Sequence, residues 1–146
     1  MSGAATRYPG PLPVAQARTT LKLSEAEGAT WRVDGPRDNV RWRDLGTAES
    51  TGGLVGMRHS RMVKPFEVET GWHWHDMDAH IVYVLKGWIK FRYDGVKEPV
   101  VVKAGACLSQ PAGVVHNVVG YSDDLELIEI NLPAVHASVP AVPTAS

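Results

Sequence analysis

Turn-forming residues recur at short intervals through the middle of this chain, so only short elements can lie between them. The intervening segments are rich in β-branched and aromatic residues, which favour strands. They are residues 80–85, 88–93, 100–102, 114–115, 118–119 and 125–130. In residues 88–93, Ile89, Phe91 and Tyr93 alternate with polar or larger neighbours, which is the period of a half-buried strand. Many short strands with almost no helical pattern predict an all-β, antiparallel sandwich or barrel. Residues 21–29 alone hint at a helix.

The length of 146 residues fits one domain. We expect a β-barrel domain over residues 29–132, preceded by an N-terminal arm (residues 1–28) and followed by a Pro/Ala-rich C-terminal tail (residues 133–146). The prolines of the tail exclude a regular helix or a central strand. We expect both ends to be loosely held, and the alternative is an extended segment that crosses to a partner subunit.

Charge and composition exclude several classes of function. The formal net charge is −1 and the pI is about 6.6, so no basic excess is available to neutralise phosphates, and we expect no nucleic-acid partner. No apolar run approaches the ~18–20 residues that cross a bilayer, so we expect no membrane association. Residues 1–13 lack the apolar core of a secretory signal. The single cysteine, Cys107, fits a cytoplasmic location and is expected to be a small core residue.

Four histidines are spaced as metal ligands. His73 and His75 are two residues apart, and on a strand such side chains share a face about 6.6–6.8 Å apart. Two imidazoles at that spacing can reach one ion, because a metal–nitrogen bond is ~2.0–2.1 Å long. His80 follows a short polar connection and can return beside His75 in a hairpin, whereas His116 needs a folded sheet to reach the others. This spacing predicts a metal site.

Two motifs around these histidines resemble those of the cupin superfamily. Gly71-x-His73-x-His75-x4-His80-x6-Gly87 is similar to the first cupin motif, G-x5-H-x-H-x3,4-E-x6-G. Gly105-x5-Pro111-x-Gly113-x2-His116 is similar to the second, G-x5-P-x-G-x2-H-x3-N. The resemblance implies a small single-domain (cupin type-2) protein with a double-stranded β-helix, the jelly-roll barrel, and a bound metal.

The chain departs from the first motif at its acidic position, where His80 replaces glutamate. The resemblance therefore implies a four-histidine site made of His73, His75, His80 and His116. One divalent transition-metal ion is expected there; the resemblance favours iron or manganese, while nickel, zinc, cobalt and copper also suit imidazole donors. Four neutral ligands would leave the ion a strong Lewis acid with two neighbouring positions open.

Three functions are compatible with such a site. The first is a metal-dependent dioxygenase acting on a small anionic or bidentate oxygen substrate such as a diketone, hydroxy acid or phenol. The second is a non-redox metal-dependent isomerase or lyase, which needs an acid or base nearby. The third is a small-ligand-binding module without catalysis. Catalytic candidates are Tyr83, His59 and Arg61, and further candidates for the acid or base are Tyr93, Glu126 and Glu129.

The remaining expectations concern neighbours of the site. Trp72 and Trp74 flank His73 on the opposite face of its strand, which predicts a subunit contact and a homodimer. Gln110 and Asn117 are candidates to hydrogen-bond the metal-binding imidazoles, and a role in loop structure is the alternative.

Overall fold

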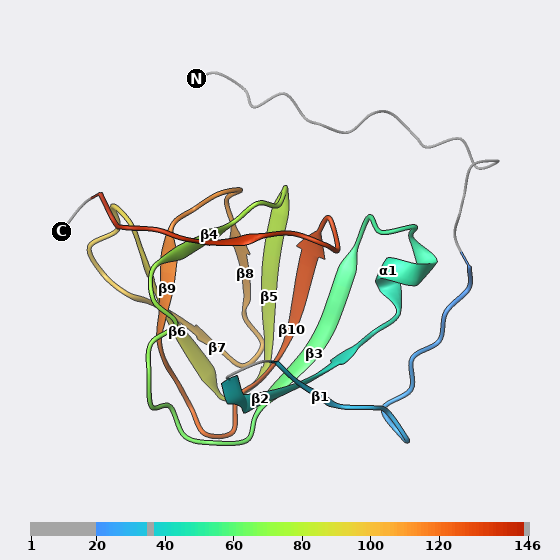
Figure 1. The fold of residues 1–146 in the computed structure, drawn as a ribbon. Helices are drawn as coiled ribbons and strands as arrows, with labels where there is room; N and C mark the ends of the chain where they lie inside the picture. The colour runs from blue at the N-terminus through green and yellow to red at the C-terminus, as the bar shows by residue number, and fades with distance from the viewer. Residues whose placement is uncertain (1–19, 35–36, 145–146) are drawn as a thin grey trace.

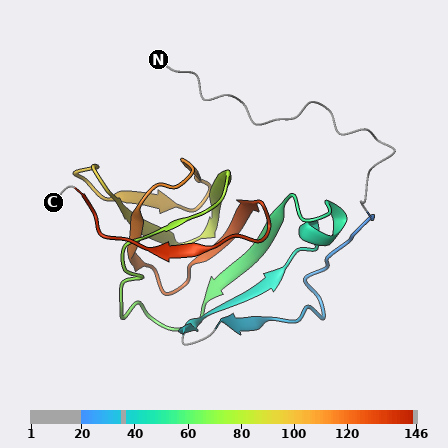
Figure 2. The same ribbon diagram turned by 45° about the horizontal axis from the view of Figure 1, so that its top comes forward.

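Two antiparallel sheets form the body of the molecule (Figures 1 and 2). The computed structural model describes residues 20–34 and 37–144. Within these residues the strands are β1 (Arg32–Asp34), β2 (Arg37–Asp44), β3 (Gly56–Met62), β4 (His73–His75), β5 (Ala79–Lys86), β6 (Trp88–Tyr93), β7 (Val100–Lys103), β8 (Cys107–Gln110), β9 (His116–Tyr121), β10 (Glu126–Leu132) and β11 (Ser138–Pro140). The predicted all-β antiparallel architecture is confirmed.

The chain crosses repeatedly from one sheet to the other. The larger sheet has the order β1-β2-β3-β10-β5-β8, and the smaller has the order β11-β4-β9-β6-β7. Strands β4 and β5 are consecutive in the chain but lie in different sheets, as do β8 and β9. The histidines on β4, β5 and β9 are therefore delivered from both sheets to the space between them.

The core fills the space between the sheets because the strands alternate as predicted. On β6, Ile89, Phe91 and Tyr93 are buried, and on β5 the buried residues Val82 and Val84 alternate with exposed or half-buried ones. Leu127, opposite Val84 in the β5–β10 register, and Leu125, just before β10, complete this cluster. This close-packed core holds the strands that carry the histidines in fixed positions.

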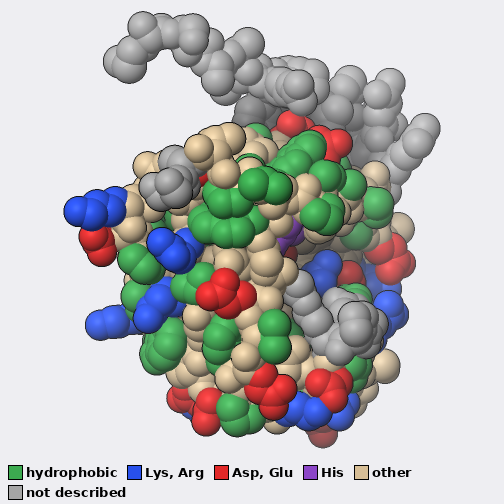
Figure 3. Space-filling model, turned by 60° about the vertical axis from the view of Figure 1, so that its left-hand side comes forward, with side chains coloured by type: hydrophobic (Ala, Val, Ile, Leu, Met, Phe, Trp, Pro, Cys, Tyr) green, Lys and Arg blue, Asp and Glu red, His purple; other side chains and the backbone are tan. Residues whose placement is uncertain are grey.

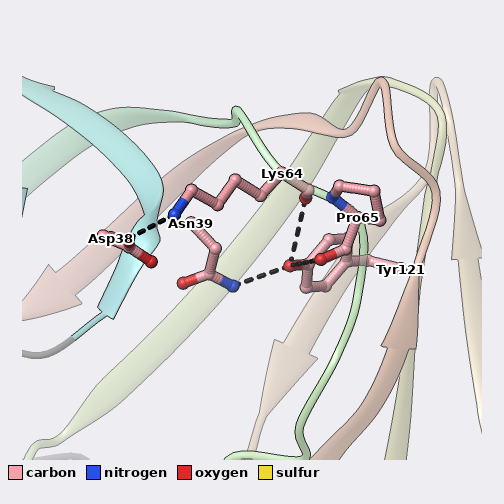
Figure 4. Close-up of polar contacts among 5 residues, drawn as sticks. All are labelled: Asp38, Asn39, Lys64, Pro65 and Tyr121. Atoms are coloured by element: carbon pink, nitrogen blue, oxygen red, sulfur yellow. Dashed lines mark hydrogen bonds and ion pairs between the residues drawn. The ribbon is translucent and has the colours of Figure 1, made fainter.

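The far end of the barrel is tied together through Tyr121, which is buried on β9 (Figure 4). Its hydroxyl accepts a hydrogen bond from Asn39 Nδ2 at 2.6 Å and lies within reach of the carbonyl oxygens of Lys64 (3.4 Å) and Pro65 (3.3 Å). The Lys64 ammonium also pairs with Asp38 of β2. These contacts join the larger sheet to the segment that leads from β3 to β4.

Several expectations about the chain differ from the structure. Residues 21–29 are not helical; the described helix is α1 (Thr47–Ser50), which follows Gly46 at φ 78°. The C-terminal tail is not loose over its described part, because β11 pairs with β4 of the same chain. Cys107 is exposed rather than in the core, since it points outward from β8. Residues 1–19 and 145–146, which include most of the expected arm, lie outside the described residues.

Among the described residues, no helix qualifies as a membrane span.

Candidate metal centre

Three histidines meet where β4 and β9 pair. His73 and His75 project from the same face of β4, as their spacing predicts, and His73 is directly opposite His116 in the β4–β9 register. The ring centroids are 4.9 Å apart for His73–His75, 4.4 Å for His73–His116 and 5.1 Å for His75–His116. One ring nitrogen from each lies within 4.8 Å of the others, so the three can share one ion.

The Nδ1 atom of each ring is turned toward a fixed protein oxygen. His73 Nδ1 lies 2.7 Å from the Gly71 carbonyl, and His116 Nδ1 lies 2.9 Å from the Val114 carbonyl. Because a carbonyl only accepts, both rings carry their proton on Nδ1. His75 Nδ1 lies 2.8 Å from the Ser138 hydroxyl, which can accept in the same way. All three Nε2 lone pairs are thereby left for an ion, so these residues fit a divalent transition metal.

The electrostatics of the cluster favour neutral rings. Burial lowers the pKa of His75 to about 3, and repulsion from His80, His116 and His73 adds to the effect. Burial also lowers the pKa of His116 to about 4, which outweighs the opposing hydrogen bond to the Val114 carbonyl. Neutral imidazole is the form that binds metal, so these rings need not lose a proton near pH 7 before they bind.

His80 is not part of the cluster, and the expected four-histidine site is corrected to three. Its ring lies 5.0 Å from that of His75 and 6.1 Å from that of His116, but both of its nitrogens already have protein partners. Gln110 Nε2 donates to His80 Nδ1 at 3.1 Å, and His80 Nε2 donates to Glu129 Oε1 at 3.1 Å. The reason is cross-strand packing: Gln110 is opposite His80 on β8, and Glu129 lies on the neighbouring strand β10.

Glu129 places a carboxylate beside the three histidines. Burial alone would raise its pKa, but the hydrogen bond from His80 and the electrostatic attraction of His80 and Arg58 lower the pKa of Glu129 to about 2. Arg58 is directly opposite Glu129 in the β3–β10 register. Position 80, where the cupin motif has glutamate, is a histidine in this chain. A glutamate from a different strand, Glu129, is hydrogen-bonded to that histidine.

Tyr93 brings a phenol to the same region from β6. Its ring centroid is 6.0 Å from that of His116, and its hydroxyl is buried without a hydrogen-bond partner among the described residues. Burial raises the pKa of Tyr93, so the hydroxyl stays protonated. Tyr93 therefore adds a buried hydroxyl without a hydrogen-bond partner to the surroundings of His116.

A small pocket opens onto the cluster. It is lined by His75, Met77, His80, Gln110, Pro111, Gly113, Val114 and His116. Figure 3 shows histidine atoms at the bottom of a recess whose edges carry hydrophobic side chains. The site therefore combines an apolar rim with polar groups at its base, as small-molecule sites commonly do.

The predicted catalytic candidates His59, Arg61 and Tyr83 lie elsewhere. His59 and Arg61 alternate with buried Ser60 on β3, and exposed Tyr83 alternates with buried Val82 and Val84 on β5, so all three project from the outer face of the larger sheet. His59 Nε2 bonds Glu126 Oε2 at 3.0 Å, and the Arg61 guanidinium lies 4.0 Å from the centroid of the Trp31 ring.

Of the two residues expected to hydrogen-bond the metal-binding imidazoles, neither is hydrogen-bonded to a histidine of the cluster in the described part of the chain. Gln110 does hydrogen-bond an imidazole, that of His80, whereas the Asn117 amide donates to Glu69 Oε2 at 2.6 Å instead. Trp72 and Trp74 are half-buried rather than fully exposed.

Sequence reasoning missed two residues of the C-terminal segment. Ser138 holds the His75 ring, and the His136 ring lies 5.5 Å from that of His75. The segment shows no strand periodicity and contains several prolines, so its sequence carries no signal for either position.

Comparisons with known proteins agree with this architecture. Residues 61–131 match the family model of the cupin domain. This part of the chain is therefore similar to a cupin domain, and the two antiparallel sheets are arranged as in the cupin double-stranded β-helix. A comparison with curated proteins found none that matches the sequence.

Several solved structures share this fold. The polyketide cyclase RemF from Streptomyces resistomycificus is 18% identical over 84% of this chain and 87% of its own, with a TM-score of 0.67. An RmlC-like cupin from Shewanella frigidimarina is 20% identical over 80% and 95%, with a TM-score of 0.61. The DMSP lyase DddQ from Ruegeria pomeroyi is 19% identical over 81% and 64%, with a TM-score of 0.59. At these identities the likeness establishes the fold.

Proposed function

We propose that this protein is a metal-dependent enzyme that moves protons on a small, bidentate oxygen substrate, as an isomerase, lyase or cyclase does. The observation that carries the proposal is the cluster of three Nε2 atoms next to two groups suited to proton transfer. These groups are the Glu129–His80 pair and the Tyr93 hydroxyl. The second of the three functions considered from sequence required such a group, and the structure brings Tyr93 and Glu129, but not Tyr83 or His59, toward the cluster.

Each residue has a distinct task in this scheme. His73, His75 and His116 would hold a divalent ion, which supplies Lewis acidity to a substrate oxygen. Glu129 is hydrogen-bonded to His80, and this pair would receive the proton that leaves the carbon next to the polarised oxygen. Tyr93 keeps its proton and can donate a hydrogen bond to the developing oxyanion. The apolar rim would limit the access of water.

The substrate class follows from the donor set. Three neutral imidazoles leave the full positive charge of a divalent ion to attract anionic oxygen, as in a diketone enolate or a 2-hydroxy acid. The resemblance to cupins favours iron or manganese, while nickel, zinc, cobalt and copper also suit three imidazoles. That a cyclase and a lyase share the fold supports non-redox chemistry on it.

A metal-dependent dioxygenase is the second candidate. An octahedral ion held by these three histidines would keep three further positions, enough for a bidentate substrate and dioxygen together. The same substrate classes, with phenols, would then be oxidised with consumption of dioxygen.

One experiment separates the two. The apoprotein is loaded with Zn(II), Mn(II) or Fe(II) and incubated with a panel of diketones, hydroxy acids and phenols, with and without oxygen. Proton exchange into substrate from deuterated water, followed by NMR, is expected with Zn(II) under anaerobic conditions. Oxygen uptake confined to the Fe(II) or Mn(II) protein would replace the proposal with the dioxygenase. Binding without turnover under every condition would leave a ligand-binding module.

A further inference from the structure

The C-terminal segment (residues 133–144) runs along the edge of the site, next to β4, rather than leaving the domain. After β10 it runs, red in Figure 1, past the ends of β5 and β10 and pairs along β4, with Ser138 opposite His75 and Pro140 opposite His73. The Ala141 amide donates to the Trp72 carbonyl at 3.0 Å. At the end of the segment, both the amide and the hydroxyl of Thr144 bond Asp94, at 2.9 and 2.7 Å. The segment is thus fixed at both ends.

This path brings a further imidazole, that of His136, to the edge of the cluster. Its ring stands nearly perpendicular to that of His75, at 83°, with the centroids 5.5 Å apart. His136 is not among the three histidines whose nitrogens converge, and within the described residues its ring contacts His75 but neither His73 nor His116. It therefore stands on the His75 side of the cluster.

The two nitrogens of His136 differ in their surroundings. Nδ1 is buried and has no hydrogen-bond partner that meets normal geometry, whereas the ring as a whole is half-exposed. Nε2 has no protein partner and is not among the buried unpaired atoms of the described residues, so it is the nitrogen that a ligand can reach. Glu129, Arg58 and His80 act electrostatically on the ring, so His136 lies within reach of the polar groups around the cluster.

We propose that His136 contacts the substrate: its Nε2–H donates a hydrogen bond to an oxygen of the small anion held at the three-histidine cluster. This inference rests on the proposed function and extends it, because it makes the C-terminal segment part of the substrate site. The ligand class is a compact oxyanion with two oxygens close together, one toward the His73–His75–His116 cluster and one toward His136. The segment then helps to decide which substrates fit.

The test uses the full-length protein loaded with Co(II), and oxalate as the probe anion. Co(II) affinity is measured by calorimetry, and oxalate affinity from the visible absorption of bound Co(II). In His136→Ala we expect the Kd of oxalate to rise tenfold or more while the Kd of Co(II) stays within twofold of wild type. His136→Gln, which keeps a hydrogen-bonding group, is expected to recover part of the loss and replaces the alanine variant if that variant fails to fold.

Matched controls make the outcomes distinct. His59→Ala removes a histidine on the outer face of the larger sheet and should change neither Kd. Unchanged oxalate affinity in His136→Ala overturns the contact, and so does a tenfold loss of Co(II) affinity, which would make His136 a metal ligand. A wild-type protein that binds no Co(II) overturns the proposed function together with this contact. Normal oxalate binding without turnover of any substrate would overturn the proposed function alone.

Discussion

Ring orientation decides which histidines can bind a metal. In His73, His75 and His116 the protein oxygen lies at Nδ1 and Nε2 is left for the ion, whereas His80 has partners at both nitrogens. We therefore expect His75→Ala and His116→Ala each to raise the Kd for Mn(II) or Co(II) at least a hundredfold, measured by calorimetry. The change in His80→Asn should be tenfold or less, as for a residue outside the ligand set. A loss in His80→Asn as large as in His116→Ala would restore the four-histidine site.

The lowered pKa values of His75 and His116 also predict how the apoprotein responds to acid. Between pH 6.5 and about 4 the unfolded chain binds protons on these rings that the folded chain does not, so stability is complete above pH 6.5 and falls as the pH is lowered. We expect the Tm of the apoprotein to fall by about 5 °C between pH 7.5 and 5.5, measured by calorimetry. His116→Gln should show a smaller fall, and His59→Gln should follow wild type; equal falls in all three would contradict this origin.

At the scale of elements, the turn between β5 and β6 depends on Gly87. Its φ is 72°, and a Cβ there would lie 2.0 Å from Ser122 Oγ and 3.2 Å from Leu125 Cα. Gly95 has a similar φ of 77°, with nothing within 4 Å of such a Cβ. Urea unfolding of Gly87→Ala should show a loss of roughly 3 kcal/mol, from backbone strain plus overpacking. Gly95→Ala introduces backbone strain without overpacking, so its free energy of unfolding should fall by roughly 1 kcal/mol. Equal losses in the two variants would show that overpacking does not contribute.

How far the sequence predicts the site depends on whether a contact is local. The pairing of His73 with His75 is set by the two-residue period of one strand, so spacing alone predicts it. The exclusion of His80 could not be predicted, because it depends on Glu129, 49 residues away on a neighbouring strand. The contact of Ser138 with His75 spans 63 residues and depends on a strand without periodicity. The fold was predictable because turn signals and alternation repeat along the whole barrel.

At the scale of the molecule, the barrel is closed at the end where Tyr121 lies. Its hydroxyl links Asn39 of β2 to the segment that follows β3. Tyr121→Phe leaves these groups without that partner, and we expect a loss of about 1–2 kcal/mol in urea unfolding. Asn39→Ala should cost a similar amount, and the double variant less than the sum, because one bond is shared. Metal affinity should stay within twofold of wild type, since a large change would show that this end of the barrel also shapes the metal centre.

The homodimer expected from sequence stays a prediction. In view of the structure, we now predict that the two copies meet through a different surface. Trp72 and Trp74 are half-buried within the chain, whereas Tyr83 and Leu85 are 41% and 45% exposed on the outer face of the larger sheet. Apolar side chains next to one another on an open sheet face favour contact with a second copy. Analytical ultracentrifugation at micromolar concentration should show a dimer for wild type and a monomer for the double variant Tyr83→Glu, Leu85→Glu.

Val101 provides the control for this surface. It is exposed to the same degree, 44%, but lies on β7 of the smaller sheet, so Val101→Glu adds a charge to an apolar position without touching the predicted contact. That variant should remain a dimer. If wild type sediments as a monomer, the dimer is excluded. If Val101→Glu dissociates the dimer while the double variant does not, the copies meet through the smaller sheet, the sheet that carries the C-terminal strand and three of the site's histidines.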